Sequence, residues 1–168
     1  MAKLSILANI LVIDDEEVMR DSCKQILSRQ GHHIKLAEDG YQGLELLKEK
    51  SFDLVILDLK MPGIDGMEVL EKIKESSPET AVVVITGYAT VESAVEAMRR
   101  GAYDFLPKPF TPGEFRLIIE RALEKKRLIL SALVLFESST FRSSSNRWLY
   151  TKIPPRGLFI SWATPAAN

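Results

Sequence analysis

Residues 53–66 read Asp-Leu-Val-Ile-Leu-Asp-Leu-Lys-Met-Pro-Gly-Ile-Asp-Gly, an apolar run closed by an aspartate and a turn sequence. The run Leu54–Leu57 is too short for a helix and has no polar alternation, which is typical of a strand covered on both faces. Asp58 follows at once, before a Met-Pro-Gly turn. The stretch therefore predicts a strand inside a parallel sheet, with a carboxylate at its carboxyl end.

Similar runs recur along the first 125 residues, separated by segments with helical periodicity. Apolar residues at i, i+3, i+4 and i+7 mark Val91–Met98 and Phe115–Leu123 as amphipathic helices. Five strands alternating with five helices predict an α/β fold with a doubly wound parallel sheet. The runs that suit strands are Ile10–Ile13, Ile34–Ala37, Leu54–Leu57, Ala81–Ile85 and Tyr103–Leu106.

The composition limits the classes of function. The chain of 168 residues has room for one ordinary domain and an extension. Residues 1–125 carry 22 acidic and 16 basic residues, whereas residues 126–168 carry 1 acidic and 6 basic ones. An acidic body argues against nucleic acid as its direct partner, because attraction to phosphates needs clustered Lys and Arg.

The chain also shows no sign of a secreted or membrane protein. Cys23 is its single cysteine, which excludes an intrachain disulfide and fits a reducing cytosol. The apolar stretch Leu128–Phe136 is too short to cross a bilayer, and residues 1–13 lack the cleavage pattern of a signal peptide. We therefore expect a cytoplasmic protein.

Polar residues follow four of the predicted strands. Asp14 and Asp15 end the first, Asp58 the third and Thr86 the fourth, and Lys108 comes directly after the fifth. Each has an ordinary role by itself, as a helix cap, a strand end or a solvated loop residue. In a parallel sheet, however, these strand ends converge on one edge, where ligands bind in such folds. We therefore expect the five side chains to share one pocket.

That combination of residue types suits phosphoryl transfer. Three neighbouring carboxylates repel one another, and a divalent cation such as Mg²⁺ relieves the repulsion through oxygen ligands. A carboxylate can act as nucleophile while Lys108 and the metal neutralise phosphoryl oxygens. Thr86 can donate a hydrogen bond to a further phosphoryl oxygen.

At these residues the chain resembles the receiver domain of bacterial two-component response regulators, and most closely the sigma-54 activator, nitrogen-regulation type. The resemblance covers about residues 9–125. It implies a flavodoxin-like receiver fold with strand order 2-1-3-4-5. The matching segments are residues 10–15, 53–68, 83–89 and 101–110.

The resemblance implies a role for each acidic residue of the pocket. Asp58 matches the phosphoacceptor. Asp15 and Asp58 match direct Mg²⁺ ligands, Asp14 matches a ligand acting through water, and the Lys60 backbone carbonyl completes the protein ligands. Mg²⁺ is thus the expected cofactor.

The resemblance also implies how the domain responds. Thr86 and Lys108 match the pair that contacts the phosphoryl group, and Phe105 the aromatic residue that rotates when Thr86 moves. The Lys108–Pro109 bond is expected to be cis. Lys60 and Tyr88 flank the approach of water, so we expect a slowly lost acyl phosphate.

The expected partners follow from the same resemblance. A sensor histidine kinase would donate the phosphoryl group, and the chain would promote only its own phosphotransfer and autodephosphorylation. Phosphorylation would change the surface made by residues 91–100, 103–106 and 111–125. A homodimer through the final strand and helices is a further expectation, whereas no direct contact with nucleic acid or membrane is expected.

Two other functions compete with a receiver. A phosphohydrolase of the dehalogenase-like class would need a second acidic residue two positions after Asp58, where this chain has Lys60. A nucleotide or flavin binder would need a Gly-rich or Ser/Thr-rich loop after the first strand. The acids of residues 14–17 would instead repel phosphate.

The end of the chain follows a different pattern. We place a receiver domain at residues 1–127 and an irregular extension, compatible with a truncated linker, at residues 128–168. Regulators of the nitrogen-regulation type continue into an ATPase and a DNA-binding domain, which makes transcription regulation the expected context. A single-domain regulator that docks through its final helix and the preceding strand is the alternative.

Overall fold

The computed structural model describes residues 7–140, and beyond residue 125 it describes only some of the side chains. The chain divides into two compact units, residues 1–131 and residues 132–168. Of the second unit, only residues 132–140 are described, and they form the last part of a helix. The first unit contains the sheet and all the predicted site residues.

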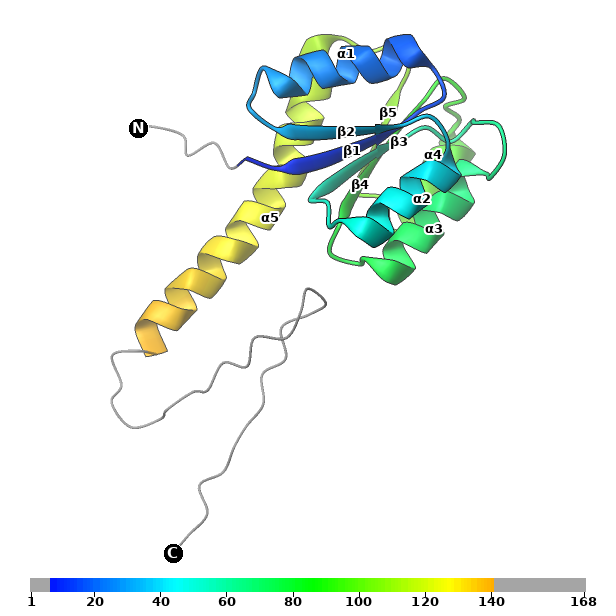
Figure 1. Ribbon diagram of the computed structural model, residues 1–168. Helices are drawn as coiled ribbons and strands as arrows, with labels where there is room; N and C mark the ends of the chain where they lie inside the picture. Colours follow the sequence, from blue (N-terminus) through cyan, green and yellow to red (C-terminus); the bar gives the residue numbers. More distant parts are fainter. Residues whose placement is uncertain (1–6, 141–168) are drawn as a thin grey trace, which may run out of the picture. The chain divides into compact units, whose positions relative to one another are not determined.

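The sheet is five-stranded and parallel, with the strand order β2-β1-β3-β4-β5 (Figure 1). This confirms the predicted fold class. The order reverses beside β1, so the carboxyl ends of β1 and β3 flank the switch point. The strands are β1 (Asn9–Ile13), β2 (His33–Ala37), β3 (Leu54–Leu57), β4 (Ala81–Thr86) and β5 (Asp104–Pro107).

Five helices alternate with the strands and cover both faces of the sheet. Figure 1 shows α1 and the first part of α5 on one face and α2 and α3 on the other. This arrangement explains the uninterrupted apolar runs, since β1, β3 and β4 have no solvent-facing side. The helices are α1 (Glu17–Ser28), α2 (Gly40–Glu49), α3 (Gly66–Ser76), α4 (Val91–Arg99) and α5 (Pro112–Thr140).

The core consists of two clusters of buried side chains, one on each face of the sheet. Alternate residues of a strand point to opposite faces, so Val55 and Leu57 join one cluster while Leu54 and Ile56 join the other. The first cluster includes buried residues of α3, and the second includes Phe115 of α5. Burial on both sides fixes the strands, and hence the position of their carboxyl ends.

The helix α5 is longer than the sequence pattern suggested. We expected an irregular segment from residue 128, but α5 continues to Thr140. The prediction stopped where the apolar stripe facing the sheet ends, yet good helix formers such as Leu128, Leu130 and Ala132 can continue a helix without a core face. The remainder of the expected extension, residues 141–168, lies outside the described residues. Among the helices described, none combines the length and apolarity required to cross a bilayer.

Candidate functional site

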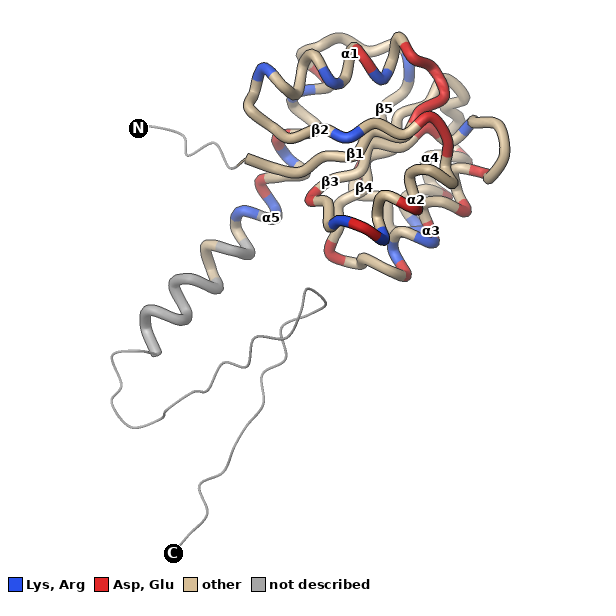
Figure 2. Tube along the Cα trace, in the orientation of Figure 1, with Lys and Arg blue, Asp and Glu red and all other residues tan. Residues whose placement is uncertain are grey.

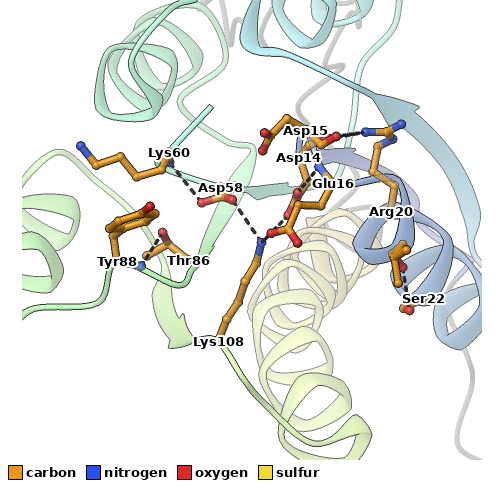
Figure 3. Close-up of polar contacts among 11 residues, drawn as sticks. Asp14, Asp15, Glu16, Arg20, Ser22, Asp58, Lys60, Thr86, Tyr88 and Lys108 are labelled. Carbon is orange, nitrogen blue, oxygen red and sulfur yellow. Dashed lines mark hydrogen bonds and ion pairs between the residues drawn. The ribbon is translucent and has the colours of Figure 1, made fainter. Parts of the chain in front are cut away.

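The sequence-predicted site residues lie at the carboxyl edge of the sheet, with Thr86 at the end of β4 and the others on the loops that follow the strands (Figure 3). Strand register sets this edge, because Ile13 of β1 pairs with Ala37 of β2 and with Leu57 of β3. Thr86 of β4 likewise pairs with Pro107 of β5. Residues that follow these strands are therefore brought level with one another.

Asp14 extends the β1 backbone into the pocket. Its amide donates to the carbonyl of Ala37 at 3.2 Å, and its side chain is almost fully buried. One carboxylate oxygen accepts the amide of Glu16 at 2.9 Å, and the other accepts the ammonium of Lys108 at 2.9 Å. Both oxygens are thus held in fixed directions.

Asp58 is held in a similar way at the end of β3. Its amide donates to the carbonyl of Ile13 at 3.0 Å, and its side chain is 5% exposed. Oδ1 accepts the amide of Lys60 at 3.1 Å, and Oδ2 accepts the ammonium of Lys108 at 3.1 Å. Gly66 lies close by, since a Cβ atom there would stand 2.6 Å from the Asp58 carbonyl oxygen. A glycine lets α3 begin directly against this loop.

Lys108 joins the acidic residues into one cluster. Its ammonium donates to Asp14, to Asp58 and, at 3.0 Å, to Glu16, and its side chain is only 11% exposed. Burial by itself would lower the pKa of Lys108, but the hydrogen bonds to the three carboxylates raise it above its ordinary value. The group is therefore a permanent positive charge in the pocket. The Lys108–Pro109 peptide bond that follows is cis, as expected.

The acidic residues outnumber this one ammonium. In Figure 2 the turn between β1 and α1 is drawn in red, which marks a concentration of acidic residues at this edge. Burial raises the pKa of Asp14 above its ordinary value, and the charge of Asp58 adds to the rise, although Lys108 and the Glu16 amide oppose it. The pocket thus favours an additional cation.

Oxygens of Asp14, Glu16 and Asp58 lie within 4.8 Å of one another, as three metal ligands would. Carboxylate oxygens are the ligands that hard cations such as Mg²⁺ prefer. The donor set therefore fits the expected metal. Asp15 is exposed and is not among these three, and its direct ligation remains a prediction.

Thr86 and the two residues expected to flank the pocket lie on its other side (Figure 3). Thr86 is fully buried, and its hydroxyl oxygen accepts the amide of Tyr88 at 3.2 Å. The backbone amide of Lys108 donates to the Thr86 carbonyl at 2.9 Å, which connects the two residues. The Lys60 ammonium lies 5.9 Å from the centre of the Tyr88 ring, a cation–π contact between the two loops. Phe105 is half-buried on β5.

Glu16 is the site residue that the sequence analysis missed. We considered it only as one of several acids that repel phosphate, but its carboxylate contacts Lys108. Glu16 is also the N-cap residue of α1 and makes no side-chain cap hydrogen bond. The Glu16 carboxylate is therefore not used to cap the helix, the ordinary role of an acid after a strand.

Comparison with known proteins identifies the family. The response regulator receiver domain matches residues 10–120, and the chain belongs to this family. This confirms the resemblance that the sequence motifs indicated. A putative NtrX-like response regulator of Rickettsia bellii is 39% identical over 124 residues, which are 73% of this chain and 26% of that relative.

Two further relatives agree. The transcriptional regulatory protein ZraR of Klebsiella oxytoca is 39% identical over 120 residues, covering 71% of this chain and 27% of ZraR. The crystal structure of the receiver domain of NtrX from Brucella abortus has 44% sequence identity and a TM-score of 0.66, covering 68% of this chain and 98% of that domain. The chain thus spans about a quarter of the full-length regulators NtrX-like and ZraR but matches an isolated receiver domain almost completely. The phosphohydrolase alternative finds no support among these matches.

Proposed function

We propose that this chain is a phosphoaspartate signalling switch, with Asp58 as the phosphoacceptor. The observation that carries the proposal is the ammonium of Lys108, which lies between the buried carboxylates of Asp58 and Asp14. A permanent positive charge beside a buried carboxylate is what a phosphoryl group needs when it arrives at that carboxylate.

The proposed reaction is a phosphoryl transfer from a phosphohistidine of a sensor histidine kinase. A carboxylate oxygen of Asp58 attacks phosphorus, an oxygen–phosphorus bond forms, and the nitrogen–phosphorus bond to the imidazole breaks. The imidazole leaves with the bonding electron pair and takes up a proton. Lys108 then turns a donor from Asp58 to a phosphoryl oxygen. Thr86, whose hydroxyl oxygen already accepts the Tyr88 amide, donates its hydrogen to another.

Mg²⁺ is part of the proposal. Asp14, Asp15, Asp58 and the backbone carbonyl of Lys60 would hold it, with Asp14 acting through water. When bound, the cation supplies positive charge that offsets the repulsion between the acids and the incoming phosphoryl group. The close approach of the Asp14, Glu16 and Asp58 carboxylates supports a cation in this pocket.

Phosphorylation adds negative charge at the sheet edge, and the proposed response is a shift of the surface formed by α4, β5 and α5. A partner that prefers one arrangement would read the state, and a second copy bound through this surface is one such partner. ZraR is a transcriptional regulatory protein, so control of transcription through another domain is the proposed context. The receiver part of the present chain would not touch nucleic acid, because its residues 1–125 carry a net negative charge.

A test uses the full chain with Mg²⁺ and phosphoramidate as the phosphoryl donor. Intact-protein mass spectrometry should show one added phosphoryl group in the wild type and none in Asp58→Asn. Asp21→Asn is the matched control, because Asp21 is an exposed carboxylate on the outer part of α1. The control should be phosphorylated like the wild type.

A wild-type chain that takes up no phosphoryl group would contradict the proposal. So would an Asp58→Asn variant phosphorylated as fully as the control. A requirement for Mg²⁺ is checked in the same assay with excess EDTA, which should abolish the added mass.

A further inference from the structure

Arg20 of α1 holds the backbone that carries the acidic residues. Its Nη1 atom donates to two successive carbonyl oxygens, that of Asp14 at 2.7 Å and that of Asp15 at 2.9 Å. Figure 3 shows the guanidinium approaching this turn from the side away from Asp58. Arg20 therefore contacts the backbone of the turn rather than the carboxylates in the pocket.

The turn needs such support for an electrostatic reason. Asp14, Asp15 and Glu16 are consecutive acids, and their mutual repulsion favours backbone conformations that spread the carboxylates apart. Glu16 does not cap α1 through its side chain, so no cap hydrogen bond of that kind fixes the entry into the helix. Charge-assisted hydrogen bonds to two neighbouring carbonyls limit the rotation of the peptide groups between them.

The rest of the turn depends on these two carbonyls being fixed. The amide of Glu16 donates to Asp14 Oδ1, and the amide of Asp14 donates to the Ala37 carbonyl. Arg20 completes the set, because it holds the carbonyl groups of Asp14 and Asp15. Without Arg20, the Asp14 and Asp15 carbonyls lose the donor described for them. The peptide groups then rotate more readily, and this rotation changes the direction in which both carboxylates point.

We propose that Arg20 is a positioning residue for the acidic pocket, one that holds the Asp14–Asp15 turn so that its carboxylates face Asp58 and a bound cation. The inference rests on the proposed function. Arg20 touches neither Asp58 nor Lys108 in any described contact, and it acts through the backbone of its neighbours.

Arg20 can be replaced without opening the core. It is half-buried and lines a surface cavity of about 260 Å³ together with Glu17, Asp21, Leu36, Glu38 and Gln42. The variant Arg20→Met keeps the length of the side chain and removes its donors. Arg20→Lys keeps a charged donor, and Arg20→Gln gives a second, polar replacement without the charge. Arg29→Met is the matched control, since Arg29 is an exposed arginine at the other end of α1.

The experiment measures three quantities on each full-length variant. Amide NMR shifts of Asp14, Asp15 and Glu16 during a titration with MgCl₂ give the dissociation constant of the cation. Mass spectrometry gives the rate of phosphorylation by phosphoramidate at saturating Mg²⁺. Urea unfolding gives the stability, which separates a positioning role from a structural one.

We expect Arg20→Met and Arg20→Gln to weaken Mg²⁺ binding by tenfold or more, roughly the effect of removing a group that orients metal ligands. Phosphorylation should slow in the same variants. Arg20→Lys should recover most of both quantities, and Arg29→Met should match the wild type.

Mg²⁺ binding by Arg20→Met and Arg20→Gln within twofold of the wild type would overturn the inference, even if both variants were less stable. A failure of the proposed function would look different, because the wild type itself would then take up no phosphoryl group. If Arg20→Met does not fold, Arg20→Gln and Arg20→Lys decide the outcome by the same criterion.

Discussion

Asp14 is held in surroundings that oppose its charge. Its carboxylate is buried at the sheet edge, and the neighbouring Asp58 adds repulsion. The ammonium of Lys108 offsets part of this effect, yet burial is the largest influence and the pKa of Asp14 is raised. A carboxylate in such a position stabilises a bound cation but lowers the folding stability of the cation-free protein. Such a loss of stability is common at functional sites.

The raised pKa predicts that Asp14→Asn is more stable than the wild type in Mg²⁺-free buffer. A folded-state pKa above the ordinary 3.8 means that the folded protein binds the proton more tightly than the unfolded chain. The stability of the wild type therefore falls as pH rises from 3.8 through the folded pKa, and the asparagine avoids this loss. We expect the free energy of unfolding to rise by about 1 kcal/mol at pH 7, the usual gain when a residue that costs stability at a functional site is replaced.

Urea unfolding at a series of pH values checks this expectation. The difference between Asp14→Asn and the wild type should shrink as the pH falls toward 3.8. Asp39→Asn serves as the control, because Asp39 caps α2 and asparagine caps a helix equally well. An Asp14→Asn variant less stable than the wild type at pH 7 would show that the bond to Lys108 outweighs the effect of burial.

The contact between Lys60 and Tyr88 predicts the lifetime of the acyl phosphate. Both side chains are exposed and lie two residues beyond Asp58 and Thr86, on the two loops that flank the pocket. Lys60→Ala and Tyr88→Ala should each shorten the half-life of the phosphorylated state by roughly two- to fivefold, the factor that a cation–π contact of 0.5–1 kcal/mol represents. Because the two side chains touch each other, the double variant should lose less than the product of the single effects.

The decay of the phosphorylated mass after removal of the donor measures this lifetime. Lys50→Ala, which changes an exposed lysine at the end of α2, should decay like the wild type. Half-lives that stay the same in both single variants would remove the idea that these side chains hinder water.

At the scale of single residues, the sequence predicted that Asp14, Asp58 and Lys108 lie together, because strand ends in a parallel sheet have to converge. Their chemical roles, and that of Thr86, stay predictions. It could not predict the contact of Glu16 with Lys108. That contact depends on the direction in which one exposed side chain turns, and no periodicity encodes such a direction. Arg20 was missed for a similar reason, since its partners are backbone carbonyls that could belong to any residue type.

At the scale of elements, the strands were predictable because burial on both faces demands apolar runs. Each predicted strand agrees with the observed one to within a residue or so at its ends. The length of α5 was not predictable from its apolar stripe. The stripe marks only the part of the helix that packs against the sheet, and a helix can continue beyond that part. Helix α4 is the opposite case, for its stripe was predicted clearly and yet is mostly exposed.

The exposed apolar stripe shows that α4 buries few side chains against the rest of the domain. Within α4 only Ala97 is buried, whereas Val91, Val95 and Met98 are exposed. The start of the helix depends on a capping box, in which the Thr90 hydroxyl accepts the Ser93 amide and the Ser93 hydroxyl accepts the Thr90 amide. An element with so little buried surface opens locally more readily than the strands do.

Thr90→Ala should therefore weaken the start of α4. Loss of the cap should cost about 1 kcal/mol, so amides of residues 95–99 should exchange with deuterium roughly fivefold faster. Amides of β1 and β3 that exchange by global unfolding should accelerate by at most the same factor and remain slower than those of α4. Thr90→Ser should behave like the wild type because it keeps the hydroxyl. Unchanged exchange in α4 would show that the capping box does not hold the helix. Amides of α4 that exchange as slowly as those of β1 and β3 would show that α4 opens only when the whole domain unfolds.

At the scale of the whole molecule, the first compact unit holds every residue of the proposed site. The unit ends at Ser131, beyond the last fully buried residue described in α5, Ala122. Phe115, Ile119 and Ala122 complete the core cluster on their face of the sheet. The packing of the first unit therefore requires the first part of α5, and no buried residue that the structure describes lies beyond Ala122.

A chain that ends at Ser131 should accordingly fold and accept a phosphoryl group like the full chain. Its free energy of unfolding should lie within about 0.5 kcal/mol of the full-length value, because every buried residue that the structure describes is kept. Its rate of phosphorylation by phosphoramidate should also be the same. A chain that ends at Glu114 is the contrasting case, since it lacks three buried residues of the core and should not fold. If the chain ending at Ser131 unfolds at clearly lower urea concentration than the full chain, residues 132–168 belong to the same cooperative unit as the receiver, and the boundary between the two units is placed wrongly.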